Sequence, residues 1–227
     1  MEPGSILPAG TARPVGLTRV GVVRCFAIAP DPLRRRSPRS SDGPVIIRGD
    51  HDLNPGMLPE PQPTAAAVLV PLIERPQGLT VLLTLRTDHL AAHAGQVSFP
   101  GGRIDARDAD ATAAALREAE EEIGLPPRLV EVIGRLDTYV TRTGFEVVPL
   151  VGFVDPGFEP RPDPIEVAEA FEVPLDFLVD PANHRRQSRE YQGTLRWFYA
   201  MPWERHYIWG ATAGMLVNLA EVLREDR

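Results

Sequence analysis

The sequence predicts an α+β fold organised around a layered sheet. Two continuous apolar runs, 65–73 and 79–85, are typical of buried strands, and the segment 74–78 between them is typical of a turn. An alanine-rich stretch near 111–123 is typical of a helix. Further strand-like and helix-like segments follow without strict alternation, and this favours an α+β sheet over a doubly wound one.

The alanine-rich helix carries its own boundary signals. Asp108 or Asp110 can act as the N-cap, because a short acidic side chain accepts hydrogen bonds from the first free N–H groups of a helix. Gly124, with Pro126 just beyond it, is typical of a helix C-terminus.

The rest of the chain predicts two kinds of region. Residues 1–62 are rich in Pro and Arg, and we expect a loosely ordered extension in which only 20–29 could form a short strand or a helical turn. Residues 63–227 should form the folded domain. Its later elements are predicted as strands at 130–136, 146–154 and 166–173, a short helix at 174–179, a hairpin over 185–199 turning at Gln192–Gly193, and an amphipathic helix at 211–224.

Composition excludes several classes of protein. The net charge of −7 argues against a general binder of nucleic acid or of anionic membranes. Cys25 is the single cysteine, so an intrachain disulfide and a site with several cysteine ligands are both excluded. No apolar run approaches the roughly 20 residues of a membrane span, and no standard signal peptide is present. We therefore expect a cytoplasmic protein with neither a nucleic acid nor a membrane as partner.

Three carboxylates near the end of the helix point to a metal ion. Glu118, Glu121 and Glu122 are spaced three or four residues apart, so they should share one helical face and repel one another. The helix macrodipole also disfavours anions at this end. Mg²⁺ prefers carboxylate oxygens together with water and phosphate, and it would relieve this repulsion. The alternative is a solvated acidic face, but Gly101–Gly102 before the helix and Gly124 after it favour the metal site.

This stretch resembles the Nudix box, G-x5-E-x7-R-E-U-x-E-E-x-G-U, in which U is a bulky apolar residue. The run from Arg117 to Leu125, REAEEEIGL, matches its second half, with Ala119 at a position where a larger residue is usual. In the first half, counted from Gly102, Asp108 stands at the position of the Glu, and the loop before Arg117 is one residue longer.

The longer loop and the upstream sequence resemble the coenzyme A pyrophosphatase branch of the Nudix hydrolases. Its motif, L-L-T-x-R-[SA]-x3-R-x3-G-x3-F-P-G-G, is matched in spacing over 82–102. Thr87 replaces Ser or Ala, which is a minor change, whereas Ala91 stands where the second Arg is expected. Arg binds phosphate through two parallel hydrogen bonds, which Ala cannot imitate. The resemblance extends over about 65–223.

The resemblance implies a Nudix-like α/β/α sandwich with a mixed central sheet. It also implies hydrolysis of a small nucleoside diphosphate substrate with Mg²⁺ or Mn²⁺, most specifically of coenzyme A or acyl-CoA to 3′,5′-ADP and 4′-phosphopantetheine. Ala91 keeps another substrate open, such as ADP-ribose, a dinucleotide, a nucleotide sugar or capped RNA. A Nudix-fold sensor without turnover is an alternative of another class, and a homodimer is one possible assembly.

The residues expected in the site fall into three groups. Glu118 and Glu122 are expected as direct metal ligands, and Glu121 as a further ligand, a holder of metal-bound water or the general base. Glu166 and Glu169 follow a Pro-rich loop and could swing in as the base instead. The remaining expectations are substrate contacts at Arg86, His93, Gly95, Gly101, Gly102 and Phe145, adenine stacking by Trp197, Trp203, Tyr207 or Trp209, and structural roles for Asp105, Asp108, Arg117 and Gly124.

Overall fold

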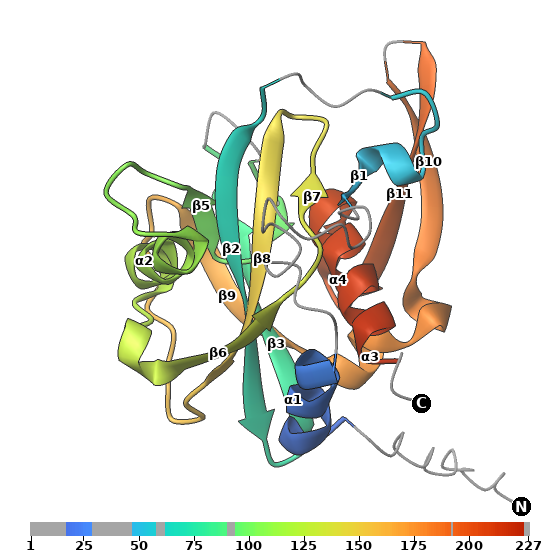
Figure 1. Cartoon of the computed structure of the whole chain (residues 1–227). Helices are drawn as coiled ribbons and strands as arrows, with labels where there is room; N and C mark the ends of the chain where they lie inside the picture. The colour runs from blue at the N-terminus through green and yellow to red at the C-terminus, as the bar shows by residue number, and fades with distance from the viewer. Residues whose placement is uncertain (1–16, 29–46, 58–61, 90–93, 192, 225–227) are drawn as a thin grey trace, which may run out of the picture.

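The computed structural model describes residues 17–28, 47–57, 62–89, 94–191 and 193–224 (Figure 1). His93 and Ala91 lie outside the described residues. No helix in these ranges is both long enough and apolar enough to cross a membrane.

A mixed sheet of nine strands forms the centre of the molecule. Its middle consists of β2 (Thr64–Arg75), β3 (Gly78–Arg86) and β8 (Phe145–Val154). β2 runs parallel to β8 and antiparallel to β3, which confirms the expected mixed sheet. The other strands of this sheet are β1 (Arg48–Gly49), β4 (Val97–Ser98), β5 (Gly101–Arg103), β6 (Val130–Arg135), β7 (Tyr139–Val140) and β9 (Val167–Pro174).

Both faces of the sheet are covered. Side chains alternate along a strand, so Ala67, Leu69 and Ile73 of β2 pack in the core beneath α2 (Ala111–Ile123). Their neighbours Ala66, Val70 and Leu72 pack in the core shared with α4 (Gly210–Val222). Figure 1 shows α2 and α4 on opposite sides of β2 and β8, which is the expected α/β/α arrangement.

A second, three-stranded sheet lies outside α4 (Figure 1). It consists of β10 (Arg185–Tyr191), β11 (Thr194–Trp203) and β12 (His206–Trp209). The sequence predicted the hairpin but not its third strand. The remaining elements are the helices α1 (Arg19–Ile28) and α3 (Leu175–Val179) and the 3₁₀ turns η2 (Asp50–Asp52), η3 (Pro127–Leu129) and η4 (Pro181–Asn183).

Two segments before residue 62 have defined structure, and α1 agrees with the helical turn that the sequence allowed at 20–29. Helix α1 buries Val22 completely in the core, and Arg19 forms ion pairs with Glu74 and Glu131. The segment 47–57 adds β1 beside β7 and places η2 against α4. These contacts are with residues far along the chain, so local composition did not reveal them. The division of the chain at residue 62 stays a prediction.

Candidate active site

Helix α2 is fixed at both ends by the residues that the sequence singled out. Asp110 is the N-cap and accepts a hydrogen bond from the Ala113 N–H at 2.8 Å. Gly124 ends the helix in the left-handed conformation, at φ 67°. Beyond it, the Asp163 N–H donates to the Glu122 carbonyl at 2.8 Å, and the Arg161 N–H donates to the Ile123 carbonyl at 2.8 Å. The end of the helix that carries the carboxylates is therefore firmly held.

The two glycines before the helix bring the sheet against these carboxylates. Gly101 has φ 149°, and a Cβ there would lie 2.4 Å from the Ala67 carbonyl oxygen of the paired strand. A Cβ at Gly102 would lie 2.6 Å from the carboxyl carbon of Glu118. Real Cβ atoms do not approach backbone atoms so closely, so position 101 requires glycine, whereas a Cβ at position 102 would displace the Glu118 carboxylate.

Glu122 is the most deeply buried of the three carboxylates. Its side chain is 3% exposed, and it accepts a hydrogen bond from the Gly101 N–H at 3.2 Å. Arg86 Nη1 lies 3.4 Å from its Oε1. Burial raises the pKa of Glu122 to about 7, since the hydrogen bond and Arg86 offset only part of the desolvation. Burial also raises the pKa of Glu118, against the opposing effect of Arg117.

Arg117 braces the loop before the helix. It donates to Asp108 from Nε and Nη2, both at 3.0 Å, and its Nη2 lies 4.0 Å from Asp105. These hydrogen bonds lower the pKa of Asp108 to about 2. Arg117 also reaches two of the carboxylates, because Nη1 donates to Glu118 at 2.8 Å and to Glu121 at 3.0 Å. One guanidinium therefore offsets part of the expected carboxylate repulsion.

Glu121 occupies a different environment from the other two carboxylates. Its side chain is 53% exposed, and it also lies 3.5 Å from Arg107. Glu118 and Glu122 are four residues apart and face Gly101–Gly102, whereas Glu121 lies toward the solvent edge of the helix. A role for Glu121 as ligand or base stays a prediction.

The two candidate bases outside the helix lie in different places. Glu166 precedes β9, and its charge contributes to the raised pKa values of both Glu118 and Glu122. Glu169 shares a strand face with Phe171, which packs in the core on the α4 side. It also contacts His206 and Arg205, at 3.1 and 2.5 Å, which lower its pKa. The structure therefore brings Glu166, but not Glu169, to the carboxylates.

The Pro-rich loop before Glu166 is anchored to both neighbouring elements. Besides its bonds to the end of α2, its Ile165 carbonyl accepts from Thr87 Oγ1 at 2.9 Å and its Glu166 carbonyl accepts from the Thr87 N–H at 3.0 Å. The inward swing that this loop could make is not needed, because the charge of Glu166 already acts on both Glu118 and Glu122.

A cleft of about 650 Å³ lies on the α4 side of the sheet, and it is lined by neighbours of these carboxylates rather than by the carboxylates themselves. Arg86 lines it, as expected for a residue at the end of a buried strand, and its Nε is buried without a hydrogen-bond partner. Gly101, Gly102 and Phe145 line it as well. Gly95 instead lies in an exposed turn at φ 67°, so it shapes the backbone before the lining residues Gln96, Val97 and Ser98.

The aromatic residues proposed for stacking divide into two pairs. Trp197 and Trp209 line the cleft, and Trp209 makes an edge contact with Phe198 at 5.3 Å between ring centroids. Trp203 packs against Phe177, and Tyr207 is exposed and bonded to Gln187.

Sequence reasoning missed four arginines of the cleft. Arg103 lies on β5. Arg142 follows β7, while Arg189 and Arg196 lie on β10 and β11. A signal was present, because a hairpin that turns at Gln192–Gly193 places Arg189 opposite Arg196, which is the observed register.

The oxygen donors of this site are chemically suited to a hard divalent cation. Glu118 and Glu122 supply two partly desolvated carboxylates beside a backbone that has no side chains to interfere. Among the described residues, no three His, Cys, Asp or Glu side chains are arranged to hold a metal by themselves. Mg²⁺ is commonly held by one or two carboxylates with water and substrate phosphates, so two protein carboxylates suffice.

Known proteins match this chain over most of its length. The family model described as NUDIX domain matches residues 63–197. Proteins named "Uncharacterized Nudix hydrolase NudL" from Salmonella typhimurium and Salmonella typhi are each 43% identical over 184 residues, covering 75% of this chain and 92% of theirs.

Solved structures give a looser likeness. A Nudix hydrolase from M. smegmatis, RenU, is 24% identical, with a TM-score of 0.41 over 51% of this chain and 73% of its own. The NUDIX domain of Shewanella oneidensis NrtR, solved with ADP ribose, is 21% identical, with a TM-score of 0.39 over 51% of this chain and 75% of its own. Neither TM-score reaches 0.5, so the assignment depends on the sequence matches. On the family model and the 43% identity to the NudL proteins, the chain belongs to the Nudix hydrolase family.

Proposed function

We propose that this Nudix hydrolase is a metal-dependent diphosphatase that cleaves coenzyme A or acyl-CoA to 3′,5′-ADP and 4′-phosphopantetheine or its acyl form. The observation that carries the proposal is the pair of carboxylates, Glu118 and Glu122, packed against Arg86, Gly101 and Gly102. These three neighbours line a cleft of about 650 Å³ together with further arginines and aromatic side chains. The upstream motif over 82–102 supports coenzyme A as the substrate.

The roles follow from the surroundings of each side chain. Nudix hydrolases generally use divalent metal ions, and we propose Mg²⁺ or Mn²⁺ held by Glu118 and Glu122. Held by these two carboxylates, such an ion would neutralise the diphosphate and would lower the pKa of a bound water. Glu166 is the proposed general base, because it lies near both carboxylates and is exposed to water.

Arg86 and the glycine backbone position the substrate. Arg86 lies between Glu122 and the cleft with its Nε unpartnered, so this nitrogen can donate to a diphosphate oxygen. Gly101 and Gly102 allow the diphosphate to approach the sheet closely. Phe145 offers an apolar wall beside Arg103, whose guanidinium lies 5.7 Å from the ring centroid.

A substrate panel tests the proposal. Purified protein with Mg²⁺ or Mn²⁺ is given coenzyme A, ADP-ribose, NADH and diadenosine polyphosphates, and kcat/KM is measured for each. Coenzyme A is expected to be hydrolysed best, and a clear preference for ADP-ribose would refute the choice of substrate. Tight binding of one compound without any hydrolysis would instead favour a Nudix-fold sensor.

The position of the missing arginine gives an independent test. If Ala91 faces a phosphate of the substrate, Ala91→Arg should lower the KM for coenzyme A. An unchanged KM would show that this position does not contact the substrate. The cytoplasmic location, the lack of a nucleic-acid partner and the homodimer stay predictions.

A further inference from the structure

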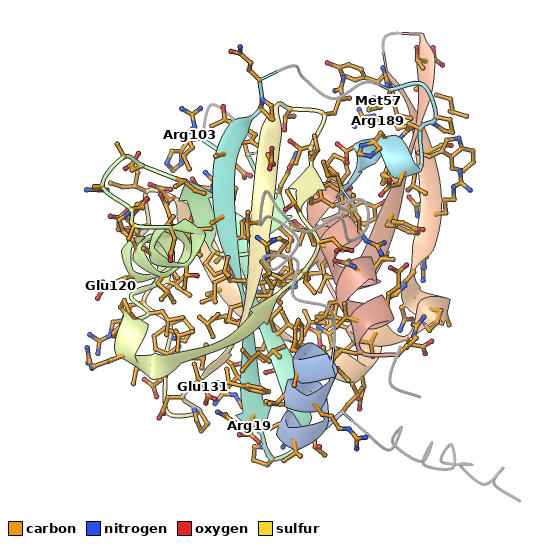
Figure 2. The ribbon with its side chains drawn as sticks, in the orientation of Figure 1. Arg19, Met57, Arg103, Glu120, Glu131 and Arg189 are labelled. Carbon is orange, nitrogen blue, oxygen red and sulfur yellow. The ribbon has the colours of Figure 1, made fainter. Side chains whose placement is uncertain are left out.

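A second charged cluster lines the cleft at the end formed by the β10–β11 hairpin. Arg142, Arg189 and Arg196 all contribute to its wall. Arg189 and Arg196 are directly opposed in the register of the two strands, so their side chains leave the same face of the hairpin. Figure 2 labels Arg189 and Met57, and both residues line the cleft.

Among the described residues, no ion pair joins any of these three guanidinium groups to a carboxylate. Asp50 is the one acidic residue that lines the cleft within the described ranges, and its oxygens accept from the Tyr139 hydroxyl and from the Arg142 N–H, at 2.9 and 2.8 Å. The Arg142 guanidinium lies 4.3 Å from the centroid of the Tyr191 ring. Arg196 Nε is buried and has no hydrogen-bond partner among the described residues.

This arrangement costs stability unless an anion is present. Like charges that face each other across a strand pair are destabilising. The chain as a whole carries a net charge of −7, so the cluster is not part of a generally basic surface. Arginine binds phosphate through paired hydrogen bonds, and a phosphate monoester carries enough negative charge to offset several guanidinium groups.

We propose that Arg142, Arg189 and Arg196 form a phosphate-binding subsite, which holds a phosphate monoester of the substrate distinct from the diphosphate that is cleaved. The inference rests on the proposed function, because it takes the diphosphate to lie beside Glu118 and Glu122. The two ends use different residues of one cleft, with Arg86 at the carboxylate end and the hairpin arginines at the other. Phe198 and Trp209 line the same cleft and offer an apolar surface for a base.

The subsite gives a physical reason for choosing among nucleoside diphosphate substrates. Coenzyme A carries a 3′-phosphate on its ribose in addition to the diphosphate, whereas ADP-ribose and NADH carry none. The hairpin arginines therefore supply selectivity for a phosphorylated nucleoside, even though Ala91 has replaced the arginine expected in the upstream motif.

The test compares two substrates that differ only in this phosphate. We expect kcat/KM for coenzyme A to exceed that for 3′-dephospho-CoA by about tenfold or more, since a charge-assisted contact of this kind is commonly worth a factor of ten. In the double variant Arg189→Gln/Arg196→Gln the ratio should fall toward one, mainly through a higher KM for coenzyme A. The melting temperature should not fall, because the substitution removes a repulsion.

Arg186→Gln is the matched control. Arg186 lies on the opposite face of the same strand, over the Trp197 ring at 4.7 Å, and its variant should keep the ratio of the unmodified protein. A ratio near one in the unmodified protein would overturn the proposal. A high ratio that survives in the double variant would also overturn it, because the phosphate would then be bound elsewhere.

A binding measurement separates this proposal from the proposed function. If the unmodified protein hydrolyses neither substrate, the proposed function fails, and calorimetry with adenosine 3′,5′-bisphosphate and with AMP decides the subsite alone. Tighter binding of the bisphosphate that is lost in the double variant supports the subsite. Equal affinities, or a difference that the double variant retains, overturn it.

Discussion

Replacing Glu122 by Gln should make the metal-free protein more stable and the enzyme much slower. Glu122 is 3% exposed, and burial raises its pKa from an ordinary value of 4.5 to about 7. Each unit of difference between the pKa values of the folded and unfolded states is worth about 1.36 kcal/mol. The ionised side chain therefore costs the folded state up to about 3 kcal/mol. Gln keeps the size of the side chain and an oxygen for the Gly101 N–H, but it carries no charge.

The sign of this effect depends on pH. A carboxyl group whose pKa is raised by folding costs nothing below about pH 4.5, where it is protonated in both states. The cost grows as the pH rises from 4.5 to about 7 and stays constant above that. Unfolding in EDTA should therefore give equal stabilities of the two proteins near pH 4 and a higher melting temperature for the variant at pH 8. For a chain of this size, 1 kcal/mol shifts the melting temperature by about 2–4 °C.

The activity should change in the opposite direction. Loss of a direct metal ligand should lower kcat/KM by at least about 100-fold, which exceeds the loss caused by partners that only support a ligand. Glu120→Gln is the control, because Glu120 is exposed on the same helix and Figure 2 shows it on the outer side of α2. It should change neither measurement appreciably. If the Glu122→Gln protein is no more stable than the unmodified protein at pH 8, the electrostatic reasoning is refuted. If its kcat/KM is unchanged, Glu122 is not a metal ligand.

Three further changes test other parts of the site. Gly102→Ala places a Cβ 2.6 Å from the carboxyl carbon of Glu118, so kcat should fall by about 100-fold while near-UV circular dichroism stays native; an unaffected kcat would show that Glu118 need not stay in place. Arg117→Ala removes the partner of Asp108 and should lower the melting temperature by several degrees, and Arg117→Lys should recover only part of it, because Lys cannot make the two parallel hydrogen bonds. If Lys restores it fully, the brace depends on charge alone. Glu166→Gln should lower kcat by about 10²–10⁴, as expected for a general base, whereas Glu169→Gln should leave kcat nearly unchanged; the reverse result would move the base to β9.

The local parts of the fold could be predicted from the sequence because local chemistry determines them. Continuous apolar runs identified β2 and β3, and Asp110 and Gly124 bounded α2 by capping rules that need no distant partner. The core helix α4 followed from its apolar pattern in the same way. These elements would be recognised in any chain with the same short segments.

The parts that could not be predicted depend on contacts between distant residues. β5 consists of Gly101–Arg103, and only its pairing with β2 makes it a strand. Helix α1 has a weakly amphipathic sequence and is held by packing and by the ion pairs of Arg19 with Glu74 and Glu131. Figure 2 labels Arg19 and Glu131 in its lower part.

In the candidate site, too, the features set by local sequence could be predicted and those set by tertiary contacts could not. The spacing of Glu118 and Glu122 predicted a pair of carboxylates on one helical face. Their burial distinguishes them from the exposed Glu121, and this burial depends on the position of the sheet. Arg142 comes from a different segment than Arg189 and Arg196, and only the tertiary fold brings it to the hairpin. An arginine that is far from the others in the sequence gives no local indication that it joins them in space.

The loop that precedes β9 acts as a spacer of fixed length. It is hydrogen-bonded to the last turn of α2 through Arg161 and Asp163 and to the end of β3 through Ile165 and Glu166. An insertion between these anchors would change the separation of Glu166 from the carboxylates, whereas the exposed turn at Gly157 lies before the first anchor and can absorb added residues. Engineers who wish to attach a reporter or to graft a longer loop onto this enzyme should therefore use Gly157 and keep the length of 161–166 unchanged.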